Sequence, residues 1–210
     1  MDRIKTAADT LRGSGMDVTL SMIDLAPIAV DIAQSIVSGF PTTRVQEAIE
    51  RLAAADAVIA STPVYKAGIS GLFKSFADLI DNDLLIAMPV ILAATGGSAR
   101  HAMVVDEQMR PLFAFLRAIP VPTSLYAAPE DWGATDLGKR VARAAIELAS
   151  SCEAGPPAPS PPTTGTATNI GSPATRRRRA ATSTAWTSAA TSCGWLRAVR
   201  PEVGQIRLAG

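Results

Sequence analysis

The chain has 210 residues, of which 48% are hydrophobic and only 5% aromatic, a composition that suits a single domain with a substantial core. No apolar run approaches the roughly 18–20 residues of a membrane span, and the N-terminus lacks the apolar stretch of a signal peptide, so we expect a cytoplasmic protein without a membrane segment. The net charge is only +1, and the two cysteines, Cys152 and Cys193, are too few to argue for a metal site or a disulfide framework.

The first part of the chain predicts helices around one strand. Residues 2–12 indicate a helix, because their apolar residues share one face and glycines follow. The stretch DVTLSMID, 17–24, alternates apolar and polar residues, which predicts a strand with one wet face at the edge of a sheet. A weaker helical pattern covers 26–38. After the loop GFPTT, Thr43 and Gln46 have the spacing of a capping box at the start of another helix.

Three apolar stretches further along predict strands that are buried on both faces. They are AVIAS at 57–61, PVILAAT at 89–95 and VPTSLYAA at 121–128.

Helical patterns separate these strands. Apolar residues recur at helical spacing from Ile69 to Ile80, then over about 99–118, where Pro111 should kink or restart the helix, and finally over 136–150. Alternating strands and helices predict a parallel α/β sheet with helices on both faces. In such sheets ligands bind beyond the carboxyl ends of the strands.

The loop TPVYK follows the first buried strand. Pro63 stiffens the turn, Val64 and Tyr65 offer a flat apolar surface, and backbone amides there precede the next helix and are free. This pattern favours a planar ring with polar edges. The alternative is a well-packed turn that carries an exposed Tyr65–Lys66 pair.

The loop TGGS follows the second buried strand and should open on the same side of the sheet. Gly96 and Gly97 let a ligand approach the backbone, and Ser98 can cap the following helix. The alternative is an ordinary turn. His101, the only histidine, has no acidic or cysteine partner at catalytic spacing, so we interpret it as a surface residue. The sequence shows no nucleophile motif, Walker loop or metal-ligand cluster.

The stretches TPVYKAGISGLFKSFADLID and PVILAATGGSARHAMVVDEQMRPLFAFLRAIPVPTS resemble the NADPH-dependent FMN reductases of the flavodoxin-like fold. More narrowly, they are similar to the actinobacterial branch partnered with luciferase-like flavin monooxygenases, as are SGFPTTRVQEAI and APEDWG. The resemblance covers about residues 2–150. It implies a flavodoxin-like doubly wound parallel sheet and an NAD(P)H-dependent FMN reductase that forms a homodimer or homotetramer.

The resemblance also implies a cofactor site. The turn formed by Thr62, Pro63, Val64, Tyr65 and Lys66 would lie against the isoalloxazine ring of FMN, and Thr95, Gly96, Gly97 and Ser98 would bond its polar edge. The loop 39–41 would border the same pocket. Hydride would pass from NADPH or NADH to FMN without a catalytic side chain, and reduced FMN would leave for a partner monooxygenase.

The chain departs from this family at its beginning. The family opens with a central strand and a Ser- and Gly-rich loop that cradles the FMN phosphate, whereas this sequence begins inside what would be the first helix. We therefore expect a domain over 1–150 that lacks its first strand, leaves the 17–24 strand without a partner and binds FMN weakly. The alternative function is a non-catalytic flavodoxin-like module that binds a flavin or a partner protein.

Residues 151–210 differ in kind from the rest. They carry seven arginines and two glutamates, against 13 basic and 17 acidic residues in 1–150, and they hold 7 of the 15 prolines. We interpret them as a low-complexity, disordered or frameshifted tail. The alternative is a functional basic tail whose TRRRR contacts nucleic acid or an acidic partner, although four arginines without interleaved aromatics give little support to nucleic-acid binding.

Overall fold

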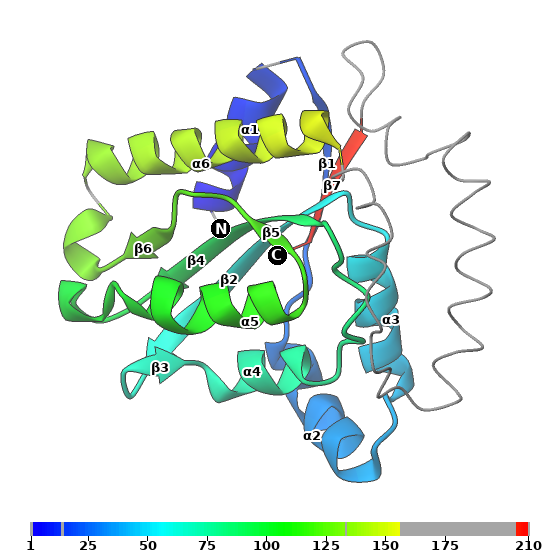
Figure 1. Cartoon of the computed structure of the whole chain (residues 1–210). Helices are drawn as coiled ribbons and strands as arrows, with labels where there is room; N and C mark the ends of the chain where they lie inside the picture. The colour runs from blue at the N-terminus through cyan, green and yellow to red at the C-terminus, as the bar shows by residue number, and fades with distance from the viewer. Residues whose placement is uncertain (1, 14, 133, 156–204, 210) are drawn as a thin grey trace, which may run out of the picture.

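A computed structural model describes residues 2–13, 15–132, 134–155 and 205–209. These residues form a sheet of seven strands with helices on both faces (Figure 1). In chain order the elements are α1 (Asp2–Gly13), β1 (Asp17–Ser21), η1 (Ala26–Ile28), α2 (Ala29–Ser38), α3 (Thr43–Ala53), β2 (Ala57–Tyr65), β3 (Gly68–Ile69), α4 (Gly71–Ala77), β4 (Pro89–Thr95), η2 (Ala99–His101), η3 (Val105–Met109), α5 (Arg110–Phe115), β5 (Ile119–Pro120), β6 (Leu125–Ala127), η4 (Pro129–Asp131), α6 (Thr135–Ala154) and β7 (Gln205–Ala209).

The sheet has the order β1-β7-β2-β4-β5, and β6 also pairs with β4. Every pairing is parallel except that of the short strand β3, which runs antiparallel to β2. A flavodoxin-like sheet has the strand order 2-1-3-4-5. The strands β1, β2 and β4 correspond to the strands numbered 2, 3 and 4 of that order, at its first, third and fourth places, which confirms the predicted α/β flavodoxin-like sheet.

The central place of the sheet is filled by the C-terminal strand β7. Its residues 205–209 pair in parallel with 17–21 of β1, and its last two residues also oppose Ala57 and Val58 of β2. The structure thus differs from two expectations: β1 has a partner, and the tail contributes a strand. The predicted tail, 151–210, also overlaps the end of α6, which continues to Ala154. For residues 156–204 and 210 that prediction lies outside the described residues.

Two hydrophobic clusters lie on opposite faces of the sheet. Val90 and Leu92 of β4 belong to the cluster beneath α2 to α5, whereas Ile91 belongs to the cluster beneath α1 and α6. Figure 1 shows α1 and α6 together over one face. Successive side chains of a strand point to opposite faces, so a strand that is covered on both sides is apolar throughout. This explains why the sequence of β4 shows no alternation.

Some local predictions need correction. The cap of α3 is Thr42, whose hydroxyl accepts a hydrogen bond from the Val45 amide at 3.4 Å, so the predicted Thr43–Gln46 capping box is wrong by one residue. The stretch 121–128 is a strand only at Leu125–Ala127, and the helix expected over 99–118 is divided into η2, η3 and α5. The kink or restart predicted at Pro111 falls where the helix type changes, because η3 ends at Met109 and Pro111 stands in the first turn of α5.

Candidate functional site

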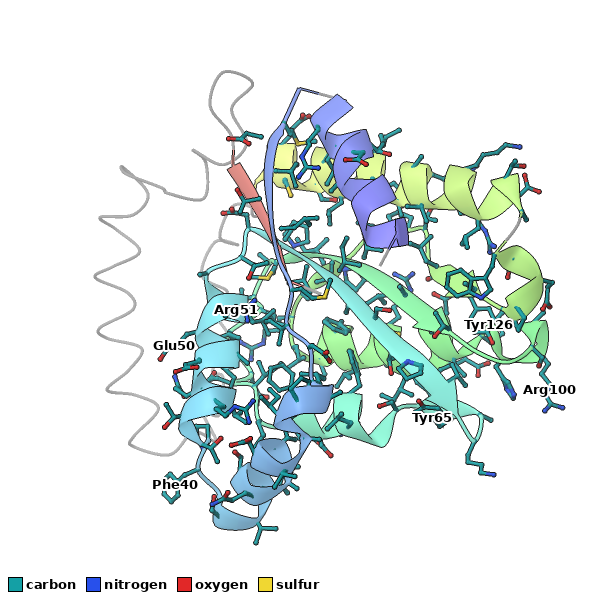
Figure 2. All side chains as sticks on the ribbon, turned by 180° about the vertical axis from the view of Figure 1, so that it is seen from behind. Phe40, Glu50, Arg51, Tyr65, Arg100 and Tyr126 are labelled. Atoms are coloured by element: carbon teal, nitrogen blue, oxygen red, sulfur yellow. The ribbon has the colours of Figure 1, made fainter. Side chains whose placement is uncertain are left out.

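The loops after β2 and β4 lie next to each other at the carboxyl edge of the sheet. Pro63 of β2 pairs with Thr95, the last residue of β4, and β2 continues to Tyr65, so the loops after both strands leave the same edge of the sheet. Figure 2 shows Tyr65, Arg100 and Tyr126 toward one side of the molecule, at this edge. The structure thus brings the two predicted ring-binding segments, 62–66 and 95–98, into one region.

The segment 62–66 ends in a tight hairpin. Tyr65 pairs with Gly68 of β3, so Lys66 and Ala67 form a two-residue turn, and both have positive φ, 50° and 62°. Such a turn favours Asn-Gly, because other residues strain the backbone at positive φ. Tyr65 is the last residue of β2, immediately before this turn, and 65% of its surface is exposed. Tyr65 and Lys66 are both exposed, which agrees with a ring platform and equally with the alternative of a turn that carries an exposed Tyr65–Lys66 pair.

Thr62 has a different position from the other residues of this segment. Its side chain is only 1% exposed, and its hydroxyl accepts a hydrogen bond from the Ser70 amide at 3.1 Å. The Ser70 hydroxyl in turn accepts a hydrogen bond from the Phe73 amide at 3.2 Å and caps α4. The Thr62 side chain therefore anchors the hairpin to α4.

The glycine loop after β4 is held by β6. The Gly96 amide donates a hydrogen bond to the Ala127 carbonyl at 3.0 Å, and the Tyr126 hydroxyl donates one to the Ser98 carbonyl at 2.7 Å. A Cβ atom on Gly96 would collide with the Tyr126 hydroxyl, whereas one on Gly97 would meet nothing within 4 Å. Gly96 is therefore needed for packing, and Gly97 leaves open space against the backbone.

Ser98 carries an unsatisfied polar group. Its hydroxyl is buried and has no hydrogen-bond partner among the described residues. The expectation that it caps the following helix is wrong, because η2 has only three residues and no side-chain cap. A buried hydroxyl without a partner is costly, so it suits a polar group brought by a ligand.

Tyr126 is a functional candidate that the sequence did not reveal. It is buried, and burial raises the pKa of its hydroxyl above 10.0, with smaller contributions from the charges of Glu130 and Asp131. The group therefore stays protonated at neutral pH and remains a donor to the Ser98 carbonyl. The only signal in the sequence was its place in a buried strand, which gives no partner.

Positive charges stand at the rim of these loops. Lys66 is exposed at the tip of the hairpin, and Arg100 is exposed just after the glycine loop. The Arg100 guanidinium donates a hydrogen bond to the imidazole of His101 at 3.2 Å, so this histidine is engaged at the surface. The two cations suit an anionic ligand.

A cavity of about 140 Å³ lies beneath the glycine loop, on the side of α1 and α6. Its wall is mainly apolar and includes Thr95, Tyr126 and Trp132, together with Ser61 of β2. A second cavity, of about 90 Å³, is lined by apolar residues apart from Ser61 and lies in the core against α4 and α5. Only the first adjoins a loop with polar groups, so it extends the candidate site.

The loop 39–41 does not join this region within one chain. Phe40 is 77% exposed, and Figure 2 places it at the opposite side of the molecule from Tyr65 and Tyr126. The expectation that it borders the same pocket is therefore wrong for the isolated chain, because the connection between α2 and α3 lies far from the ends of β2 and β4.

Other kinds of site find little support in the described residues. No group of three or more His, Cys, Asp or Glu side chains is placed to hold a metal ion among them. No helix in that part of the chain is long and apolar enough to span a membrane.

Comparison with known families and proteins points to flavin reduction. Residues 3–133 match the family model of NADPH-dependent FMN reductases. An FMN reductase (NADPH) from Pseudomonas aeruginosa is 36% identical over 138 residues, which are 66% of this chain and 74% of the relative. The NADH-dependent FMN reductase SfnF from Pseudomonas fluorescens is 37% identical over 129 residues, 61% of this chain and 69% of the relative.

A solved structure supports the same relationship. An oxidoreductase from Corynebacterium diphtheriae is 40% identical to this chain and superimposes with a TM-score of 0.67. The match covers 71% of this chain and 84% of that protein.

Proposed function

This chain belongs to the NADPH-dependent FMN reductase family, and we propose that it reduces FMN at the expense of NADPH or NADH at the two loops after β2 and β4. In this proposal, the exposed face of Tyr65, with Pro63, Val64 and Lys66, supports the isoalloxazine ring. The loop from Thr95 to Ser98 binds the polar edge of the ring.

The buried hydroxyl of Ser98 is the observation that carries this proposal. It has no partner in the described protein, and it stands on a loop whose Gly97 leaves space for close approach. The carbonyls and nitrogens at the edge of a flavin can exchange hydrogen bonds with a hydroxyl and with backbone amides. The residues present therefore fit the ring.

The chain's own residues act by binding and positioning. The redox chemistry comes from the bound molecules: a hydride from the nicotinamide and a proton from solvent reduce FMN and leave NAD(P)⁺. This requires the nicotinamide and the flavin to be stacked and held at reacting distance, which the strained hairpin and the braced glycine loop can provide. The exposed cations Lys66 and Arg100 suit the phosphates of the two nucleotides.

We further propose that reduced FMN leaves this site for a flavin-dependent monooxygenase. The exposure of Tyr65 supports this, because a ring that rests on an open surface can be released. We also propose a homodimer or homotetramer. The exposed apolar side chains of Val30 and Val37 on α2, together with Phe40, support an interface between copies, which sedimentation or size-exclusion chromatography would test.

The direct test is the oxidation of NADPH and of NADH by the full chain, with and without FMN. We expect nicotinamide oxidation that depends on added FMN. The substitution Ser98→Ala should raise the KM for FMN about tenfold, the change that corresponds to one lost hydrogen bond.

Ser150→Ala is the matched control, because the Ser150 hydroxyl is exposed and donates only to the Ile146 carbonyl within α6. This variant should behave as the wild type. FMN binding without nicotinamide oxidation would instead identify a non-catalytic flavin-binding module, and oxidation that does not require FMN would contradict the proposal.

A further inference from the structure

One side chain ties the hairpin after β2 to the helical segment that follows the glycine loop. Gln108 stands in η3, the π-helical turn Val105–Met109, well beyond the glycine loop in the chain. Its carbonyl oxygen accepts a hydrogen bond from the Ile69 amide at 3.0 Å, and its amide nitrogen donates one to the Ala67 carbonyl at 3.3 Å. Both partners belong to the hairpin that follows β2.

The Gln108 contacts fall where the hairpin is strained. Ala67 is one of the two non-glycine residues with positive φ in this turn, and Ile69 opposes Val64 in the short antiparallel pair. Gly68 lies so close that a Cβ atom there would be 3.3 Å from the Gln108 carbonyl oxygen. Left-handed backbone at such residues persists only where surrounding contacts hold it. Gln108 supplies two such contacts.

The position of Gln108 in the chain makes this contact informative. The segment that carries it follows Ser98 through η2, and Tyr126 holds the Ser98 end of the glycine loop against β6. A displacement of the hairpin relative to η3 would therefore break the Gln108 bonds. π-Helical turns are rare and occur frequently at functional sites.

We propose that Gln108 is a positioning residue that fixes the Tyr65 hairpin to η3, beyond the glycine loop, and thereby sets the opening between the two loops that receives the flavin ring. The inference rests on the proposed function for its flavin. Gln108 itself need not touch FMN, since its amide is engaged by the hairpin backbone. Its loss should let the turn at Lys66 and Ala67 relax and displace Tyr65.

The test compares Gln108→Leu, which loses both hydrogen bonds at similar size, with Gln108→Glu, which keeps an acceptor for the Ile69 amide but cannot donate to Ala67. We expect Gln108→Leu to raise the KM and the dissociation constant for FMN about tenfold while the KM for the nicotinamide nucleotide changes little. Gln108→Glu should lie between this variant and the wild type.

A second substitution separates positioning from general damage. Glycine adopts positive φ without strain, so Ala67→Gly should restore much of the FMN affinity in the Gln108→Leu background. The matched control is Gln46→Leu, because Gln46 is an exposed helical glutamine that donates to Glu50 on α3, away from the site. It should leave FMN binding unchanged.

Hydrogen exchange of the flavin-free protein gives a readout that needs no flavin. In Gln108→Leu the Ile69 amide loses its acceptor, so it should exchange faster, while amides in β4 should keep their wild-type rates. Unchanged Ile69 exchange would overturn the inference, as would wild-type FMN affinity in Gln108→Leu. A wild-type chain that binds no FMN would instead overturn the proposed function, and the role of Gln108 in flavin binding with it.

Discussion

The contact between Gly96 and Tyr126 gives the sharpest test of how the glycine loop is built. A Cβ atom on Gly96 would overlap the Tyr126 hydroxyl and come within 3.1 Å of the ring carbon that bears it. Overpacking of this kind costs about 1–3 kcal/mol. Because Gly96 has no positive φ, an alanine without this clash would change stability little or raise it by about 0.4–1 kcal/mol. The clash therefore decides whether Gly96→Ala lowers or raises the free energy of unfolding.

A double-mutant cycle with Tyr126→Phe isolates this contact. Tyr126→Phe alone removes the hydrogen bond to the Ser98 carbonyl and should cost about 0.5–1.5 kcal/mol. It also removes the oxygen that a methyl group at position 96 would meet. In the Tyr126→Phe background, Gly96→Ala should thus cost at least about 1 kcal/mol less than in the wild type, well beyond the usual additivity error of about 0.3–0.5 kcal/mol.

The assay is urea unfolding of the four proteins, followed by circular dichroism, with FMN affinity measured in parallel. Gly97→Ala is the matched control, since a Cβ atom there meets nothing within 4 Å and should not destabilise the protein. If Gly96→Ala costs the same in both backgrounds, Tyr126 is not what excludes a side chain at Gly96, and the packing argument for this loop is wrong.

Three further outcomes follow from the structure. Burial raises the pKa of the Cys152 thiol to about 12, so in a Cys193→Ser background a thiol reagent should modify Cys152 only after unfolding. Burial opposes the ionisation of Asp106, but hydrogen bonds from Ser124 and Arg110 and the charge of Arg110 outweigh it and hold its pKa below 3.8. Its stabilising effect is present above pH 3.8 and lost as the pH falls below that value, so Asp106→Asn should destabilise at neutral pH and lose its effect in acid, as thermal melts would show. Deleting 205–210 removes the strand between β1 and β2 and should lower the melting temperature and speed exchange of the β1 amides, whereas an unchanged melt would exclude β7 from the folded sheet.

The elements that the sequence predicted best are those with a strong local signal. The bounds of β4 were predicted correctly. The strand begins at a proline, and its side chains pack into the hydrophobic clusters on both faces of the sheet, so its sequence is a nearly continuous apolar run. The cap of α3 was misplaced because Thr42 and Thr43 are adjacent and both suit the position. Only the backbone geometry selects Thr42.

The contacts that the sequence could not predict join distant residues. Tyr126 meets the loop at Gly96 from the neighbouring strand β6, and Gln108 reaches Ala67 from a π-helical turn. Neither contact leaves a periodic pattern in the sequence. The strand β7 escaped prediction because five residues at the end of a tail without periodicity carry no signal of their own. Its partner β1 did carry a signal, the alternation of apolar and polar residues over 17–24, which is typical of a strand with one buried face.

The most direct test of the central claim is a titration of the full chain with FMN, followed by the quenching of flavin fluorescence. If the Tyr65 hairpin and the Ser98 loop form a ring site, quenching should saturate at micromolar FMN, and Ser98→Ala should shift the midpoint to higher concentration while Ser150→Ala leaves it in place. Fluorescence that stays unquenched, or quenching that Ser98→Ala does not alter, would contradict the assignment of these loops as the flavin site.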